Sequence, residues 1–272
     1  MVLEDFEFNG ERLSNKNCII CSVNTSNSNS VSMGSSLSFD SIVNNATYIT
    51  ENLRVDYPNN ISCTFDIIKD DCVSGVDKTF TQKEISYFRR WLNSKTDQKF
   101  IPVYDEEKFD VIYYYGTFTD IDAIYIGGKI IGLTLSFLSN APWGYQDNTT
   151  FTTTIENGGG DFTIYDDGDE VGFSYPESVI ITCNEAGDLI LANSLDSHSF
   201  VLNNVIMGEI LNIDCRNKIL TSSNHSGLYN DFNFRYPRIV TTSSLAPNVF
   251  TSNLGCDIKI KYSSIRKVGI IV

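Results

Sequence analysis

The residues best suited to catalysis in this chain of 272 residues are its two histidines, His198 and His225. An imidazole acts as the general base of a serine hydrolase or as a zinc ligand of a metalloprotease, but each role needs partners at a set spacing. Neither histidine comes with a Gly-x-Ser-x-Gly elbow or a His-Glu-x-x-His pair. The sequence therefore predicts no catalytic residue, and we expect that the protein is not an enzyme.

The cysteines raise the possibility of a zinc site, because Cys18 and Cys21 form a Cys-x-x-Cys pair and Cys63 and Cys72 lie in the same half. In an extended strand, residues three apart face opposite sides and cannot bind one ion. Thiols buried in a core are the favoured interpretation. The odd total of seven cysteines also fits a reducing compartment better than a disulfide framework.

Two acidic groups could bind a cation. The run Asp166-Asp167-Gly168-Asp169-Glu170 lacks the alternating oxygen ligands of a helical calcium loop, so an acidic hairpin tip is favoured. Asp120 and Asp122 could form a metal or acid/base pair, but solvated carboxylates at a strand start are favoured.

The glycine run Gly158-Gly159-Gly160 has no Lys-Ser/Thr and no helix behind it, so it is not a phosphate loop. We expect no metal and no cofactor.

Aromatic residues cluster near the end of the chain, at Tyr229, Phe232, Phe234 and Tyr236. Exposed rings on a β-sandwich can bind sugar, yet the last three alternate with polar residues as a strand facing a core does. A carbohydrate-binding, lectin-like module in host attachment is therefore the alternative function, with Tyr229 and Trp143 as the residues to test.

The net charge of -14 is divided evenly between the two halves, and no basic patch is present. A uniformly acidic surface repels phosphate, so sequence-specific nucleic-acid binding is not expected. The N-terminus lacks the basic and apolar regions of a secretory signal. No apolar run approaches the roughly 20 residues of a membrane helix. We expect no membrane insertion and a cytosolic protein until it joins an assembly.

The stretch from Gly116 to Tyr145 indicates how these residues are positioned, because it predicts two strands joined by a tight turn. Gly127-Gly128 can adopt the positive φ values of a two-residue hairpin. The pattern then breaks between Ser139 and Gly144, where Pro142 lacks the N–H that a ladder needs. We therefore expect two domains, residues 1–140 and 141–272.

The first domain is expected to be mostly β, with one amphipathic helix over 81–94. Asn9-Gly10 predicts a hairpin near the N-terminus. Thr81 and Glu84 form a capping box ahead of an apolar stripe. Further strand-like runs are 37–43, 48–55 and 61–68, and residues 24–36 form a Ser/Asn-rich loop.

The second domain has no convincing helix. It has short apolar runs separated by Gly/Asn/Asp turns at regular spacing, which favours a two-sheet β-sandwich. The predicted strands are 149–155, 161–165, 170–173, 178–183, 188–193, 199–202, 209–214, 217–220, 237–240 and 255–262.

This arrangement resembles the distal tail protein family of bacteriophages, over nearly the whole chain. The matching stretches are Gly127 to Tyr145, Tyr175 to Ile181, Gly208 to Asp214, Tyr236 to Val240 and Cys256 to Tyr262. The resemblance implies a split-barrel belt domain followed by a galectin-like β-sandwich.

The resemblance also implies a structural protein of the virion, assembled in the bacterial host cytoplasm and located at the tail tip. Proteins of this family form a hexameric ring that connects the tail tube protein to a tail-associated hub, fibre, receptor-binding protein or baseplate, and leaves a channel for DNA. Some members carry a carbohydrate-binding insertion, for which residues 145–272 leave no room. The sequence does not indicate which residues form the ring interface.

Overall fold

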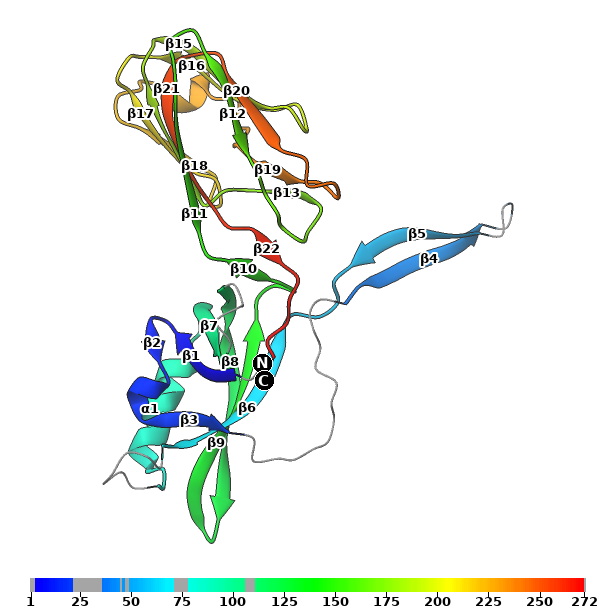
Figure 1. Ribbon diagram of the computed structural model, residues 1–272, viewed down its shortest axis with the longest axis vertical. Coiled ribbons are helices and arrows are strands. Elements are labelled where there is room, and N and C mark those ends of the chain that lie inside the picture. Colours follow the sequence, from blue (N-terminus) through cyan, green and yellow to red (C-terminus); the bar gives the residue numbers. More distant parts are fainter. Residues whose placement is uncertain are drawn as a thin grey trace. The chain divides into compact units, whose positions relative to one another are not determined.

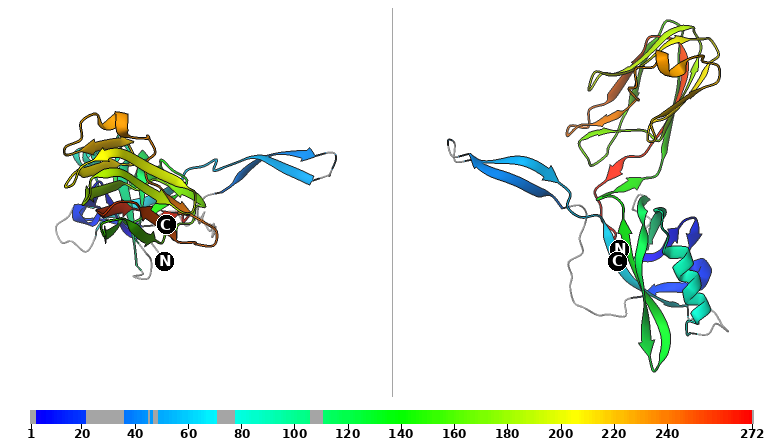
Figure 2. Two further views of the ribbon diagram at one scale, coloured as in Figure 1. Left: turned by 90° about the horizontal axis from the view of Figure 1, so that it is seen from above. Right: turned by 180° about the vertical axis from the view of Figure 1, so that it is seen from behind.

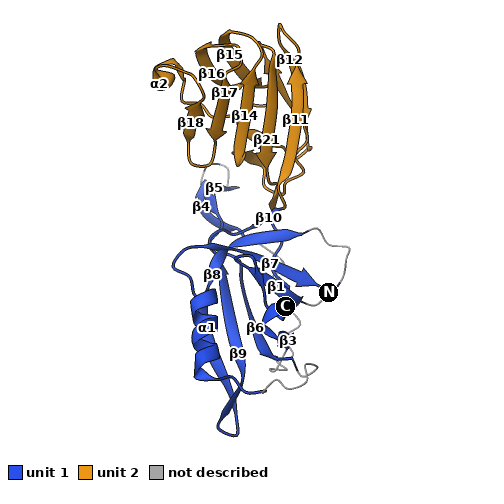
Figure 3. Ribbon diagram, turned by 90° about the vertical axis from the view of Figure 1, so that its left-hand side faces the viewer, with its two compact units in different colours: residues 1–146, 266–272 blue, residues 147–265 orange. Residues whose placement is uncertain are grey.

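The structure is a computed structural model. It describes residues 3–21, 36–44, 46, 49–70, 78–105 and 111–271. The chain forms two compact units (Figure 3). The first unit comprises residues 1–146 together with 266–272, and the second comprises 147–265. Strands are the predominant regular structure in both units, so the mainly β prediction is confirmed. No described helix is long and apolar enough to span a membrane.

The first unit is organised around one antiparallel sheet, whose strands have different lengths and follow the order β2-β1-β7-β8-β9-β6-β3. Strand β10 pairs with both β8 and β22. The stretch after Gly116 contains most of β8 and all of β9, and these two strands lie near the middle of the sheet. The strands are β1 (Leu3–Phe8), β2 (Glu11–Arg12), β3 (Cys18–Cys21), β6 (Ser62–Lys69), β7 (Gln98–Tyr104), β8 (Ile112–Ile126), β9 (Lys129–Ser139), β10 (Gly144–Gln146) and β22 (Ile265–Arg266), with a 3-10 turn at Ser14–Lys16.

Both hairpins predicted for this unit are confirmed. The turn at Asn9-Gly10 joins β1 to β2, with φ values of 52° and 78°. The turn at Gly127-Gly128 joins β8 to β9, with φ values of 58° and 77°. Positive φ at both central residues is what a two-residue turn needs to match the twist of the flanking strands.

The helix α1 (Gln82–Leu92) covers one face of this sheet (Figure 2). It begins with the predicted capping box, in which Thr81 accepts from the Glu84 N–H and the Glu84 side chain accepts from the Thr81 N–H. Phe88 and Leu92 are buried in the core between helix and sheet. That core is largely aromatic, and the rings of Phe100 and Phe137 stack at 4.4 Å.

The strands β4 (Ser38–Asn44) and β5 (Ile49–Asp56) form a separate antiparallel pair, called the β4–β5 ribbon below (Figure 1). Among the described residues, these strands pair only with each other. The predicted Ser/Asn-rich loop over 24–36 lies almost wholly outside the described residues.

The second unit is a two-sheet sandwich, as predicted (Figures 1 and 2). One sheet has the order β11-β21-β14-β17-β18 and the other β12-β20-β15-β16, with a further pair β13-β19. Alternate residues of β14 and β21 point into a single apolar core. The strands are β11 (Thr149–Ile155), β12 (Gly160–Ile164), β13 (Gly172–Ser174), β14 (Ser178–Cys183), β15 (Gly187–Asn193), β16 (His198–Val205), β17 (Ile210–Asp214), β18 (Ile219–Ser222), β19 (Ile239–Thr241), β20 (Asn248–Ser252) and β21 (Cys256–Tyr262).

Two expectations for this unit are wrong. It contains one short helix, α2 (Leu228–Asp231), which is a single turn and too brief to show an apolar period. The acidic run at 166–170 is not a hairpin tip, because β12 pairs with β20 and β13 pairs with β19. That run connects two different strand pairs instead.

The predicted boundary assigned the last residues of the chain to the second domain, but the structure does not place them there. Residues 266–272 return to the first unit. There the Tyr114 hydroxyl donates to the carbonyl of Val268 at 2.8 Å, and the Ile271 N–H donates to the Tyr104 hydroxyl at 3.2 Å. Backbone groups of the terminal segment are thus bonded to side chains of β7 and β8.

Candidate functional site

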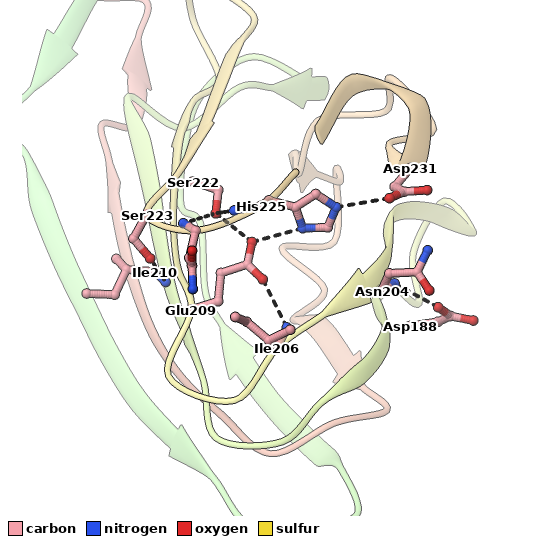
Figure 4. Close-up of polar contacts among 10 residues, drawn as sticks. Asp188, Asn204, Ile206, Glu209, Ile210, Ser222, Ser223, His225 and Asp231 are labelled. Carbon is pink, nitrogen blue, oxygen red and sulfur yellow. Dashed lines mark hydrogen bonds and ion pairs between the residues drawn. The ribbon is translucent and has the colours of Figure 1, made fainter. Parts of the chain in front are cut away.

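His225 lies at the centre of a cluster of polar side chains in the second unit (Figure 4). Its Nδ1 atom is 3.0 Å from a carboxylate oxygen of Glu209, and its Nε2 atom is 3.1 Å from Asp231. Ser222 donates its hydroxyl to the same Glu209 oxygen at 2.5 Å, and the other Glu209 oxygen accepts from the Ile206 N–H at 3.0 Å. Every oxygen of the buried Glu209 carboxylate is therefore bonded.

Four different segments supply this cluster. Glu209 follows the turn at Gly208, where φ is 83°, and immediately precedes β17. Ser222 ends β18, and its hydroxyl accepts from the N–H of His225. Asp231 is the last residue of α2. The cluster thus fastens the segment after β18 and the short helix to the edge of the five-stranded sheet.

The cluster contains serine, histidine and carboxylate side chains, but their connections are not those of a hydrolase. In a catalytic triad one ring nitrogen receives the serine proton and the other faces the acid. Here both ring nitrogens face carboxylates, and Ser222 is bonded to Glu209. The His225 side chain is also only 3% exposed. This arrangement stabilises the fold and offers no nitrogen to a substrate.

The other histidine, His198, is held by the main chain. Its Nε2 atom is 3.0 Å from the carbonyl oxygen of Tyr236. Burial lowers the pKa of His198, and the nearby Arg238 guanidinium lowers it further. Arg238 itself is paired with Asp196 at 2.6 Å. No serine or cysteine nucleophile is bonded to this ring among the described residues.

The structure places the residues that were weighed as cation ligands in separate parts of the fold. Cys18 is buried and Cys21 is partly buried, in β3. Asp166 is buried and accepts from the hydroxyls of Ser264 and Thr241. Within the described part of the chain, no group of three or more His, Cys, Asp or Glu side chains could hold a metal ion. Of the remaining predicted residues, Asp120 and Asp122 are exposed in β8, Cys63 is buried, and Cys72 lies outside the described residues.

The aromatic cluster differs from its prediction at one residue. Phe232 and Tyr236 are buried, but Phe234 is 61% exposed and has a φ of 58°. Its ring stacks on that of Tyr229, with 6.1 Å between the ring centres. A left-handed backbone reverses the direction of the side chain, and this explains why simple alternation failed. Trp143, the other aromatic residue predicted for sugar contact, lies in the first unit, where its ring N–H donates to the Tyr145 hydroxyl at 3.2 Å.

The outer face of the five-stranded sheet carries two depressions. One has a volume of about 370 Å³ and is lined by residues including Asn212, Asp214 and Arg216. The other has a volume of about 510 Å³ and is lined by Thr152, Lys259 and neighbouring residues. Neither is lined by an aromatic side chain, so neither offers the ring face on which sugars commonly stack.

The β4–β5 ribbon exposes several apolar side chains in the first unit. Apolar side chains on both strands are exposed, and that of Leu53 is 66% exposed. Leu53 occupies a bulge, since Asp40 pairs with Arg54 and Ser41 with Asn52. The exposed apolar residues of the ribbon are Phe39, Ile42, Val43, Ile49, Leu53 and Val55.

Sequence reasoning did not single out Glu209, Ser222 or Asp231. The available signal was weak: an acidic residue after Gly208, immediately before an apolar strand. The β4–β5 ribbon was predicted as strands, but its exposure was not.

Comparison with protein families decides what kind of chain this is. Residues 1–141 match the family model described as a phage tail protein N-terminal domain, and residues 143–262 match that described as a phage tail C-terminal domain. The chain belongs to the phage tail protein family. The resemblance to phage tail proteins that the sequence indicated is therefore confirmed.

Solved structures share the fold of this tail protein. The crystal structure of the Dit protein of phage SPP1 matches with a TM-score of 0.66 and 13% identity, and the match covers 96% of this chain and 98% of that chain. A chain of the phage P2 baseplate in its activated conformation matches with a TM-score of 0.51 and 11% identity, over 96% and 98% of the two chains. No curated protein sequence matches the tail protein significantly. At these identities the likeness establishes the fold.

Proposed function

We propose that this tail protein is a structural component of the distal end of a phage tail. In this proposal, six copies form a ring that connects the tail tube protein to a hub, fibre, receptor-binding protein or baseplate. The ring leaves a channel for DNA. The protein has no enzymatic role and no cofactor, is assembled in the host cytoplasm and resides in the virion. The observation that carries the proposal is the fold shared with SPP1 Dit over 96% of this chain.

The names of the similar structures support this role. The SPP1 protein is described as a paradigm of the hub adsorption apparatus in phages that infect Gram-positive bacteria. The P2 chain belongs to a baseplate. Both chains match along nearly their full length, so each unit of this tail protein has a counterpart in them.

The β4–β5 ribbon supports assembly through the first unit. A single two-stranded ribbon is marginally stable in water, and contiguous exposed apolar surface usually marks an interaction site. Burying one of these side chains would contribute on the order of 2 kcal/mol. We infer that the ribbon packs on a neighbouring copy when the ring closes.

The charge of the chain supports the channel. The net charge is -14, and a polyanion such as DNA is repelled by an acidic wall and therefore passes without adhering. A ring whose inner wall is lined by Lys and Arg would contradict this part of the proposal.

Native mass spectrometry combined with electron microscopy of the purified protein tests the ring. We expect six copies per particle, with a central channel. Leu53→Asp places a charge in the apolar ribbon and should shift the protein to monomers. Asn52→Asp is the matched control, since it adds the same charge at the adjacent exposed residue and should leave the ring intact. A strict monomer at high concentration, alone and together with the tail tube protein, would contradict the proposal.

Carbohydrate binding is kept as a second function because of one observation, the exposed ring pair of Tyr229 and Phe234. Sugar rings stack on such surfaces through their C–H groups. On a glycan array, Phe234→Asn should abolish binding while keeping the left-handed backbone, which asparagine tolerates. Tyr165→Ala removes another exposed aromatic ring of this unit and is the control. Equal signals from wild type and Phe234→Asn would exclude this site.

A further inference from the structure

Cys183 and Cys256 lie directly opposite each other in the five-stranded sheet of the second unit. Cys183 ends β14, Cys256 begins β21, and the two residues are register partners. Side chains of directly opposed residues lie on the same face of a sheet. Both side chains point into the core, with exposures of 1% and 0%.

Backbone hydrogen bonds show whether Cys183 and Cys256 form a hydrogen-bonded or a non-hydrogen-bonded pair of the antiparallel strands. The N–H of Cys183 donates to the carbonyl of Glu209 at 2.9 Å, and the carbonyl of Cys183 accepts from the N–H of Gly208 at 2.7 Å. Both groups therefore face the β17 side and not β21. The next pair along is bonded instead, since the Asn184 N–H donates to the Gly255 carbonyl at 2.9 Å.

Cys183 and Cys256 thus form a non-hydrogen-bonded pair, the type in which opposed Cα atoms are about 4.5 Å apart and side chains come closest. A disulfide requires Cα atoms about 4.4–6.8 Å apart. The strand register therefore meets the main geometric requirement of a disulfide without any change in strand pairing.

We propose that Cys183 and Cys256 are a latent disulfide site, which closes when the tail protein meets a thiol oxidant such as hydrogen peroxide. No other described cysteine has a cysteine opposite it in a strand pair. Cys18 faces Lys69, Cys21 faces Asp66 and Cys63 faces Phe137. The bond would join two central strands and close a loop of about 70 residues, which restricts the unfolded chain.

The reaction transfers two electrons. The thiolate of one cysteine attacks the peroxide, the O–O bond breaks, and a sulfenic acid and hydroxide form. The second thiol then attacks the sulfenic sulfur, the S–S bond forms, and water leaves. In total, two thiols and one peroxide give one disulfide and two water molecules.

Burial keeps this site reduced in the cell. It raises the pKa of Cys183 to about 12, and it also raises the pKa of Cys256. Because the thiolate is the reactive form, oxidation at neutral pH is slow. This step rests on the proposed function: the reducing cytosol of the host maintains the thiols during assembly, and the oxidising medium outside the cell favours the bond in the released particle.

Peptide mapping of the full-length protein tests the site. The protein is incubated with hydrogen peroxide, its remaining thiols are blocked in denaturant, and it is digested with trypsin and a glutamate-specific protease. These enzymes place Cys183 in peptide 178–185, Cys215 in 210–216 and Cys256 in 239–259. We expect a link between the first and third peptides, at least tenfold more abundant than any other cysteine link. The oxidised protein should unfold at a temperature at least about 5 °C higher.

Cys215→Ser provides the matched control, because Cys215 is equally buried in the same unit and burial raises its pKa to about 12 as well. It should form the link unchanged, whereas Cys183→Ser should not form it. A second arm refolds the wild-type protein with oxidised glutathione, so that slow access to the core cannot hide the bond. Absence of the link in both arms, or a link from Cys183 to Cys215, would overturn the proposal.

Discussion

The Nδ1 atom of His225 lies 3.0 Å from the carboxylate of Glu209, whose side chain is completely buried. The opposite ring nitrogen lies 3.1 Å from Asp231, so the imidazole bridges two carboxylates. The His225 ring, the Ser222 hydroxyl and the Ile206 N–H together surround the buried Glu209 carboxylate with polar partners.

Removing the Glu209 charge should therefore destabilise the second unit. Glu209→Gln keeps the shape of the side chain but replaces one of the two carboxylate oxygens by an amide NH2. One acceptor is therefore lost, either the oxygen that accepts from the Ile206 N–H or the oxygen shared by Ser222 and His225. We expect a loss of about 3 kcal/mol in the free energy of unfolding, measured by urea denaturation. Asp188→Asn is the control, since this exposed carboxylate accepts the N–H of Asn204 at 3.0 Å and lies outside the His225 cluster (Figure 4). Equal stability of wild type and Glu209→Gln would contradict the assigned role.

Glu185 should make the stability of the second unit depend on acid pH. Its carboxylate accepts the N–H groups of Gly158 at 2.8 Å and Gly255 at 2.6 Å. These backbone hydrogen bonds lower the pKa of Glu185 below its ordinary value of about 4.5. The stabilisation is therefore present above pH 4.5 and is lost as the pH falls through the lowered folded-state value.

Thermal unfolding from pH 7 to pH 3 measures this effect. The difference in midpoint between wild type and Glu185→Gln should be largest above pH 4.5 and should shrink below it. Glu156→Gln removes the same charge from the neighbouring exposed residue, and it separates the effect of net charge from that of the hydrogen bonds. If the difference in midpoint between wild type and Glu185→Gln grows as the pH falls, the pKa of Glu185 is not lowered by folding.

Thr81 should contribute to the first unit through the helix start. Thr81→Ala removes the hydroxyl that accepts from the Glu84 N–H at 3.3 Å, and the free energy of unfolding should fall by about 1 kcal/mol. Ser86→Ala, at an exposed position inside α1, removes a hydroxyl without removing a cap and should be neutral or slightly stabilising. Circular dichroism during urea unfolding distinguishes the two variants.

Local signals made much of the fold predictable from sequence. Asn9-Gly10 and Gly127-Gly128 specify their turns through backbone conformation alone, and Thr81 with Glu84 specifies a helix start within four residues. Alternation likewise predicted β14, because a strand with one face in the core repeats every two residues.

The cluster around His225 depends on how strands distant in sequence pair, and no local sequence pattern predicts it. Glu209 and His225 are 16 residues apart and meet only because β17 pairs with β18. Phe234 followed the alternation of a strand, but its positive φ turned the ring outward. The return of residues 266–272 to the first unit also depends on tertiary contacts, such as that of Tyr114 with Val268.

Gly116 should be among the least replaceable residues of the first unit, because strand β9 passes directly over it. A Cβ atom at this position would lie 2.2 Å from the carbonyl oxygen of Leu138 and 2.7 Å from the ring of Phe137. The obstructing atoms belong to backbone and to a ring stacked on Phe100, so neither can move without disturbing the core. Gly116→Ala should therefore cost about 3 kcal/mol of unfolding free energy.

The matched control is Gly160→Ala in β12, where the nearest atom to an added Cβ is a methyl group of Ile155 at 3.4 Å. This variant should change stability by less than about 0.5 kcal/mol. Because the two substitutions add the same methyl group to a strand, their difference isolates the close approach of β9 to Gly116. Similar unfolding midpoints for the two variants would mean that β8 and β9 can separate enough to accept a side chain, and the tight pairing at the centre of the sheet would be refuted.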